Sequence, residues 1–426
     1  MSENVQKTLR DSAALRWLAL ILLAGAMFCS YIFMDILSPI KDLMWDTKGW
    51  DSTAFGTMQG SETFLNVFVF FLIFAGIILD KMGVRFTAIL SGAVMLVGAT
   101  INWYALTDMF AGSNLEVWFN EHLNYIPGFD ELGVSPFYKG MPASAKFSAI
   151  GFMIFGCGVE MAGITVSRGI VKWFKGREMA LAMGSEMALA RLGVATCMIF
   201  SPMFARLGGE VSVSRSVAFG VVLLMIALIM FIVYAFMDKK LDSQTGEAEE
   251  KDDPFKLSDL GKILTDSGFW LVALLCVLYY SAIFPFQKYA VNMLQCNLVF
   301  HQVDPSSIWA SNTITIIQYV IMLVVAACAF ASNFSKNKVA KYGLMGAAIV
   351  ALVVFCYMGY MRQSAETVFA VFPLLAVGIT PILGNYVDHK GKAATMLVLG
   401  SLLLIACHLT FAFVLPAFKG SEVGGI

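Results

Sequence analysis

The stretch GIILDKMGVR, residues 76–85, places one acidic and two basic residues between two long apolar runs. Nearly the same spacing returns in GNYVDHKGK, residues 384–392. Each copy has a glycine, then an aspartate, then a second glycine at the same intervals, and basic residues follow, among them Arg85: the two sets are Gly76, Asp80, Gly83 and Gly384, Asp388, Gly391. One copy could be an ordinary turn between helices. Two copies at one spacing indicate that the chain consists of two related halves.

The composition is that of an integral membrane protein. Of 426 residues, 58% are hydrophobic and 14% are charged, whereas an average soluble domain carries roughly 25% charged residues. The net charge of −1 says nothing about partners, and no basic tract indicates a nucleic-acid partner. The eight cysteines form no CxxC pair and the four histidines are scattered, so we expect no metal site and no cofactor.

Eleven apolar runs are long enough to cross a bilayer core of about 30 Å, and each must be a helix because lipid offers no partner to backbone amides. Six form a predicted bundle over residues 1–237, and five form a second over 264–426. Between them, 238–263 is predicted to be a cytoplasmic linker. The runs are 17–44, 55–79, 84–107, 145–173, 178–205, 213–237, 268–298, 307–332, 342–361, 366–387 and 393–416.

The connecting segments predict the orientation. Most of their Lys and Arg residues fall on one side of the membrane, which should be the cytoplasmic side and should hold the N-terminus. We expect a multi-pass protein of a cell membrane. The absence of an acidic dileucine signal near the N-terminus favours a bacterial inner membrane over a lysosome. In the long loop 108–144, the piece NLEVWFNEHL is either a short surface helix or ordinary loop.

The two repeated loops resemble the loop signature of the major facilitator superfamily, which follows the second span of each six-span half. The resemblance implies two helical bundles with a substrate cavity between them. Several stretches are similar to the lysosomal dipeptide transporter group of that superfamily: SYIFMD (30–35), WFKGRE (173–178), ARLG (190–193), YYSAIFPFQKYA (279–290), PILGNYVDHKG (381–391) and HLTFAF (408–413).

Two features depart from that family. An arginine usual in its fourth span is replaced here by Phe152. The second loop signature follows the tenth predicted span instead of the eighth. We therefore expect a second bundle with two inserted spans, 307–332 and 342–361, and without counterparts of the family's last spans, as in a fragment of a longer protein.

Seven ionisable residues lie inside the predicted spans: Asp35, Glu62, Glu160, Arg168, Glu186, Arg191 and Lys288. Each would cost about 2.5–3.5 kcal/mol in mid-bilayer, so each should be paired or face water. Similar depths on neighbouring spans predict a central pair of Glu160 with Arg191 and a second intramembrane pair of Arg168 with Glu186. Either pair could also be purely structural.

The resemblance implies that Glu160 and Arg191 match the family's substrate-binding acid and base. Arg191 would then hold a substrate carboxylate, and Asp35 or Glu160 an ammonium group. Lys288 supplies a second base, from the seventh span. Tyr31, Tyr279 and Tyr280 either line the cavity or serve only in packing.

The sequence therefore favours a secondary transporter that moves a small zwitterion, above all dipeptides, by alternating access, with or without protons. An organic anion carrier is one alternative. A non-transporting receptor or accessory protein on a degraded transporter fold is another. An enzyme is disfavoured because no nucleophile constellation or phosphate-binding loop is present. The expected partners are the solute and the bilayer, and an accessory subunit stays open.

Overall fold

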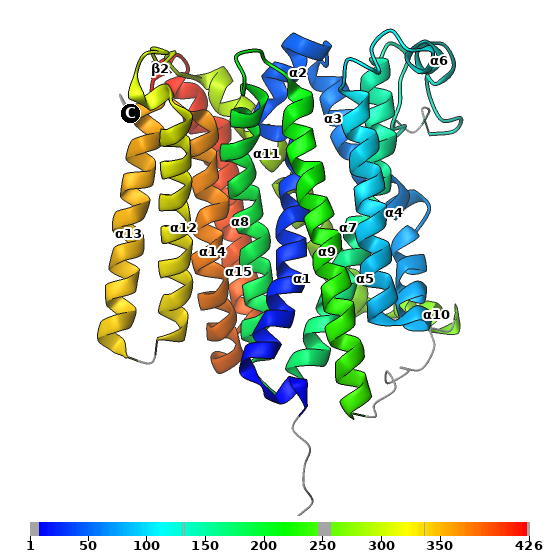
Figure 1. Cartoon of the computed structure of the whole chain (residues 1–426), viewed down its shortest axis with the longest axis vertical. Helices are drawn as coiled ribbons and strands as arrows, with labels where there is room; N and C mark the ends of the chain where they lie inside the picture. The colour runs from blue at the N-terminus through cyan, green and yellow to red at the C-terminus, as the bar shows by residue number, and fades with distance from the viewer. Residues whose placement is uncertain (1–7, 130, 132, 246–256, 336, 424–426) are drawn as a thin grey trace, which may run out of the picture. The chain divides into compact units, whose positions relative to one another are not determined.

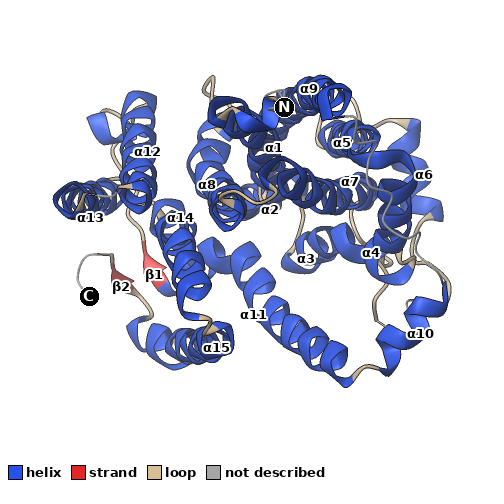
Figure 2. Cartoon of the chain, turned by 90° about the horizontal axis from the view of Figure 1, so that it is seen from below, coloured by secondary structure: helices blue, strands red, loops and turns tan. Residues whose placement is uncertain are grey.

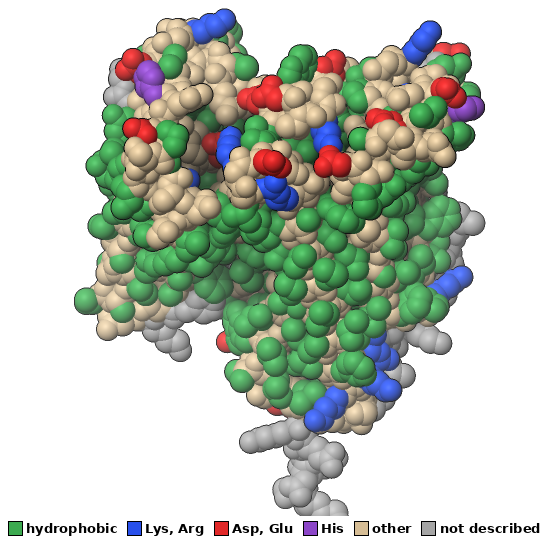
Figure 3. All heavy atoms as spheres, turned by 45° about the horizontal axis from the view of Figure 1, so that its top comes forward, with side chains coloured by type: hydrophobic (Ala, Val, Ile, Leu, Met, Phe, Trp, Pro, Cys, Tyr) green, Lys and Arg blue, Asp and Glu red, His purple; other side chains and the backbone are tan. Residues whose placement is uncertain are grey.

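The computed structural model describes residues 8–129, 131, 133–245, 257–335 and 337–423, and these are helical almost throughout (Figure 1). The chain divides into two compact units. The first comprises Met1–Gly193 and Phe204–Phe255, and the second comprises Val194–Met203 and Lys256–Ile426. Figure 3 shows hydrophobic side chains over most of the visible helix flanks, with charged side chains gathered towards helix ends.

The first unit is a helical bundle in which α5 packs against α7 and α9, and α9 packs against α1. Its elements are η1 (Leu9–Asp11), α1 (Ala13–Met34), η2 (Ser38–Ile40), α2 (Lys41–Lys48), α3 (Ser52–Gly60), η3 (Ser61–Thr63), α4 (Phe64–Phe68), α5 (Phe71–Ala105), α6 (Asn114–His122), α7 (Ala143–Phe174), α8 (Met179–Ala205) and α9 (Val213–Thr245). Within α8, Val194–Met203 is assigned to the second unit. Within NLEVWFNEHL the structure thus has a helix, α6.

In the second unit α12 packs against α13 and α14, and α11 also contacts α14. Gln318 of α12 joins these helices, because its amide donates to Thr367 Oγ1 (3.2 Å) and accepts from Arg362 (2.8 Å). The elements are α10 (Leu257–Thr265), α11 (Ser267–Asn297), β1 (Leu298–Val299), η4 (Ile308–Ala310), α12 (Asn312–Phe334), α13 (Lys338–Met361), α14 (Ala365–Lys390), α15 (Ala393–Leu409), η5 (Thr410–Val414), η6 (Leu415–Phe418) and β2 (Ser421–Glu422), and the two short strands pair in parallel (Figure 2).

Helices cover most of each of the eleven predicted spans. Among the described residues, nine helical segments are long and apolar enough to cross a membrane. Two of the eleven predicted spans are not among these nine segments as separate helices. Residues 84–107 belong to the second limb of α5, and 366–387 lie in α14, of which Ala365–Thr380 counts as a shorter apolar helix.

Gly83 turns α5 into a hairpin. Its backbone leaves the helical region with φ 79° and ψ 170°, a conformation that glycine adopts without steric cost. A methyl group on Gly156 of α7 would meet the Glu62 carbonyl group, and one on Gly158 would lie 2.7 Å from the Met95 nitrogen. The chain before and after Gly83 therefore passes α7 at nearly one level, which confirms the predicted reversal between 55–79 and 84–107.

The prediction of one continuous span over 55–79 is wrong. The chain forms α3, η3 and α4 in turn, and α5 begins only after Phe70, which has a left-handed φ of 56°. Gly60, Thr63 and Asn66 are weak helix formers, and they interrupt an otherwise apolar run. In contrast, α9 continues to Thr245, beyond the predicted end of the sixth span at residue 237.

The close packing of α5 against α7 at Gly151 leads to a testable prediction. A methyl group on Gly151 would lie 2.6 Å from the Gly98 carbonyl oxygen and 2.7 Å from the Asn102 nitrogen. Gly151→Ala should therefore lower the free energy of unfolding by about 1–3 kcal/mol, the usual cost of overpacking. Thermal unfolding in detergent measures it. Gly76→Ala is the control because no atom lies within 4 Å there; equal effects of the two changes would contradict the close packing.

Candidate functional site

Glu160 of α7 is an exposed residue within a membrane-spanning helix. The most apolar window of α7 is 72% buried, yet Glu160, Ser167 and Val171 are exposed along one helix face. A carboxylate at mid-bilayer in contact with lipid would cost about 2.5–3.5 kcal/mol. We infer that this face of α7 borders water.

Arg191 lies on α8, the next helix along the chain, and is half-buried. Its charge acts on Glu186, which precedes it by just over one turn and is buried. Among the described residues, no ion pair joins Glu160 with Arg191 or Arg168 with Glu186, and Arg168 pairs with Asp80. Depth along the span is readable from the sequence, whereas the rotation of a helix about its axis is not.

Tyr31 of α1 lies close to α8. A methyl group on Gly193 would stand 2.5 Å from the Phe28 carbonyl oxygen and 3.4 Å from the Tyr31 Cβ atom. Gly193 follows Arg191 by two residues, so Tyr31 and Arg191 lie at a similar level of the first unit. The side chain of Tyr31 is half-exposed.

Asp35, in the first unit, and Lys288, in the second, are both buried. Asp35 caps the C-terminal end of α1, and Ser38 donates a hydrogen bond to its Oδ1 atom at 3.5 Å. Lys288 lies in α11 and is 8% exposed. Tyr279 uses its hydroxyl group within the second unit, where it lies 2.8 Å from both the Leu397 carbonyl oxygen and Ser401 Oγ.

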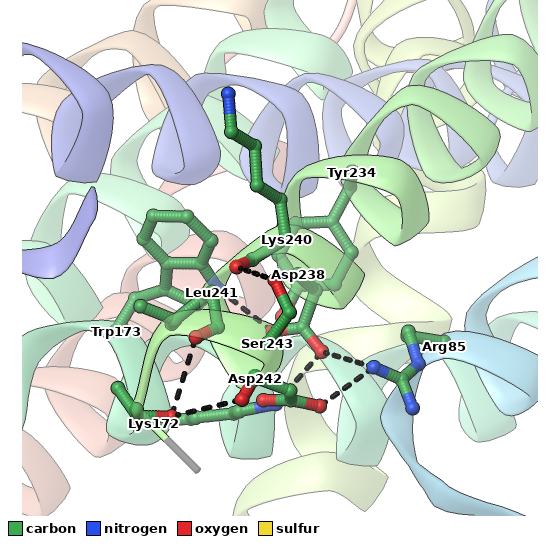
Figure 4. Close-up of polar contacts among 10 residues, drawn as sticks. Arg85, Lys172, Trp173, Tyr234, Asp238, Lys240, Leu241, Asp242 and Ser243 are labelled. Carbon is green, nitrogen blue, oxygen red and sulfur yellow. Dashed lines mark hydrogen bonds and ion pairs between the residues drawn. The ribbon is translucent and has the colours of Figure 1, made fainter. Parts of the chain in front are cut away.

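The first copy of the repeated loop is held by ion pairs. Asp80 pairs with Arg168 of α7, and both side chains are about one third exposed. Arg85, beyond the Gly83 turn, pairs with Asp242 of α9 at 2.6 Å (Figure 4). In the second copy, Gly391 has φ 63° between α14 and α15. Gly384 and Asp388 lie on α14, and their side chains are outside the described part of the chain.

Around Asp238, side chains from three helices form what we call the Asp238 cluster: Arg85, Lys172, Trp173, Tyr234, Asp238 and Asp242. The Asp238 side chain is fully buried. It accepts from Lys172 Nζ at 2.7 Å, from Trp173 Nε1 at 3.0 Å and from the Tyr234 hydroxyl at 3.4 Å. Lys172 Nζ also lies 2.7 Å from Asp242 Oδ1 (Figure 4).

This cluster was not predicted, because the predicted sixth span ends at residue 237, before Asp238. A signal was present: Tyr234, Asp238 and Asp242 recur every four residues, which places them on one helix face. That spacing predicts a helix that continues beyond the apolar run, as α9 does.

The N-terminal element η1 packs at the end of the first unit that holds the Asp238 cluster. Arg177, in the α7–α8 connection, pairs with Asp11 at 2.8 Å, and Leu9 N donates to Gln244 Oε1 of α9 at 2.9 Å. Hydrogen bonds from Thr8 and the nearby Arg177 charge lower the pKa of Asp11. These contacts join η1 to the α7–α8 connection and to α9, close to the Asp238 cluster.

The described helices form a multi-pass membrane protein with a glycine-turned hairpin held by ion pairs and an exposed Glu160 within a spanning helix. Helical bundles of this kind are typical of membrane transporters. The sequence model of the Major Facilitator Superfamily matches residues 23–367, and the chain belongs to this superfamily.

Relatives with assigned names share part of the chain. The lysosomal dipeptide transporters MFSD1 of Pongo abelii and Homo sapiens are each 24% identical over 280 residues, which is 64% of this chain and 52% of theirs. That of Gallus gallus is 29% identical over 145 residues, 32% of each chain. The chain thus spans about half the length of these relatives, or less.

Two solved transporter structures are similar over most of the chain. One is a bacterial homologue of the human drug peptide transporters, with 13% identity, coverage of 92% of this chain and 99% of that chain, and a TM-score of 0.45. The other is the xylose transporter XylE from E. coli, with 9% identity, 88% and 99% coverage, and a TM-score of 0.44.

Proposed function

We propose that this transporter moves a small zwitterionic solute, with dipeptides as the substrate class, by alternating access. One observation carries the proposal: Glu160 is an exposed residue in mid-span, on the helix that precedes the one bearing Arg191. The relatives named as dipeptide transporters support the same substrate class.

The chemistry of a dipeptide suits these residues. Its carboxylate can accept two parallel hydrogen bonds from the guanidinium group of Arg191, a geometry that lysine does not offer. Its ammonium group needs an acid, which Glu160 or Asp35 supplies. Tyr31, which lies at a similar level to Arg191, is proposed to contact the peptide between its two charged ends.

Uptake into phosphatidylcholine proteoliposomes tests this function. A labelled dipeptide should accumulate, and excess unlabelled dipeptide should compete. An N-acetylated dipeptide and a dipeptide amide should each compete poorly, because each lacks one of the two charges. Equal competition by the N-acetylated form would favour an organic anion carrier using Arg191 and Lys288. No uptake of either class would favour a non-transporting protein.

The pair of Asp80 with Arg168 is proposed to stabilise one of the two open states. A partly exposed pair contributes about 0–1 kcal/mol to folding, but a similar energy can shift an equilibrium between two conformations severalfold. Asp388, in the second copy, is proposed for the corresponding role.

Asp80→Asn therefore should slow dipeptide uptake severalfold and leave thermal unfolding nearly unchanged. The control is Lys81→Gln, which alters the adjacent exposed residue. Both measurements use the same reconstituted preparations. A rate for Asp80→Asn equal to that of Lys81→Gln would remove the pair from the gating proposal.

The distribution of Lys and Arg supports a cytoplasmic N-terminus, and we propose this orientation in a bacterial inner membrane. An epitope on the N-terminus should be protected from protease in intact right-side-out vesicles and cleaved after permeabilisation. Cleavage in intact vesicles would place the N-terminus outside and contradict the proposed orientation.

A further inference from the structure

The loop between α5 and α7 contains α6, and this helix is fastened to the bundle along one side. Its one buried residue, Phe119, belongs to a small apolar cluster with Phe110 and Ala143. The Phe119 and Phe147 ring centroids are 5.1 Å apart. The position of α6 against α7 is therefore fixed by aromatic packing.

A buried lysine reinforces the attachment. Lys146 of α7 is 1% exposed, and its ammonium group donates to the Phe119 carbonyl oxygen at 3.1 Å and to Asn124 Oδ1 at 3.3 Å. A cation at the C-terminal turn of a helix also stabilises the helix dipole. Lys146, Phe119 and Asn124 all belong to the first unit.

The residues that hold α6 determine its depth. Phe110 and Phe119 contact α7 between Ala143 and Ile150, which are the first two turns of that helix. With 32 residues, α7 is about 48 Å long, well above the roughly 30 Å of a hydrocarbon core. Its first turns therefore lie at the membrane interface, and α6 lies beside them at the edge of the first unit (Figure 2).

The side chains of α6 divide into two faces at 100° per residue. Leu115, Trp118 and His122 share a face with the buried Phe119. Glu116, Asn120 and Glu121 lie on the other side of the helix, together with Val117, which is 50% exposed. Leu115 and Trp118 are nevertheless exposed, by 37% and 48%. The apolar face thus extends beyond the part that the bundle covers.

We propose that this uncovered face lies in the head-group region of the bilayer, with phospholipid as its partner. Tryptophan is enriched at that level, where its ring contacts acyl chains and its N–H stays near water. The acidic opposite face would point to water, as in other interfacial helices. Because its two charges are negative, the helix suits zwitterionic lipid better than acidic lipid.

Fluorine NMR of the full-length protein tests the proposal. The eight tryptophans are replaced biosynthetically by 5-fluorotryptophan, and the resonance missing in Trp118→Phe identifies Trp118. The protein is reconstituted in phosphatidylcholine nanodiscs with a nitroxide at the fifth acyl carbon, or with a soluble gadolinium chelate added. Trp50, which is fully buried, serves as the internal reference after assignment by Trp50→Phe.

The lipid nitroxide should broaden the Trp118 resonance severalfold more than that of Trp50, and the chelate should broaden it less than the nitroxide does. Stronger broadening by the chelate than by the nitroxide would place Trp118 in water and overturn the proposal. Broadening by neither reagent would mean that protein covers the face, which also overturns it.

Discussion

Replacing Arg191 with alanine is expected to abolish dipeptide uptake by proteoliposomes while the protein stays folded. Hydrogen bonds to charged groups contribute about 1.5–3 kcal/mol each, so loss of one such bond should lower uptake at subsaturating substrate by about tenfold or more. Loss of a bidentate contact should lower it further. Arg191→Lys keeps the charge but not the paired geometry, and should retain only a small part of the activity.

The electrostatic effect of Arg191 on Glu186 requires a control, since Arg191 could serve only to neutralise this buried acid. The double variant Arg191→Ala/Glu186→Gln removes both charges together. If Arg191 holds the substrate carboxylate, the double variant stays inactive. Recovery of uptake in the double variant would assign Arg191 a structural role and remove it from the proposed site.

The membrane-spanning helices were predictable because the length and hydropathy of a run bear directly on whether it can cross a bilayer. The Gly83 reversal was predictable for a similar reason: charged residues and a turn-permitting glycine interrupt two apolar runs there. The break between α3 and α5 was not, because a few weak helix formers such as Asn66 hardly change the average hydropathy of a long window.

Partner choice among the charged residues was the least predictable feature. Arg168 was assigned to Glu186 by depth, yet it pairs with Asp80 from the neighbouring hairpin. The choice depends on helix rotation and on which hairpin packs beside α7, and both are set by glycine contacts such as that of Gly156 with Glu62. The burial of Lys146 likewise depends on a loop whose path the sequence does not specify.

Replacing Asp238 with alanine is expected to produce the largest loss of stability. Three donors, from Lys172, Trp173 and Tyr234, converge on its fully buried carboxylate. Removing one partner of a buried charged pair costs about 3–5 kcal/mol, because the remaining groups are left without a partner in a dry environment. Thermal unfolding in detergent and the yield of monodisperse protein measure the loss.

Asp242→Ala is the matched control, since this carboxylate sits one turn away in the same cluster but keeps 15% exposure. Water can replace part of its contacts to Arg85 and Lys172, so its loss should cost clearly less. Asp238→Asn retains an acceptor for Trp173 and Tyr234 while it removes the charge, and should fall between the two. Equal destabilisation by Asp238→Ala and Asp242→Ala would show that overall charge balance at this end of the bundle, rather than the buried hydrogen bonds of Asp238, determines stability.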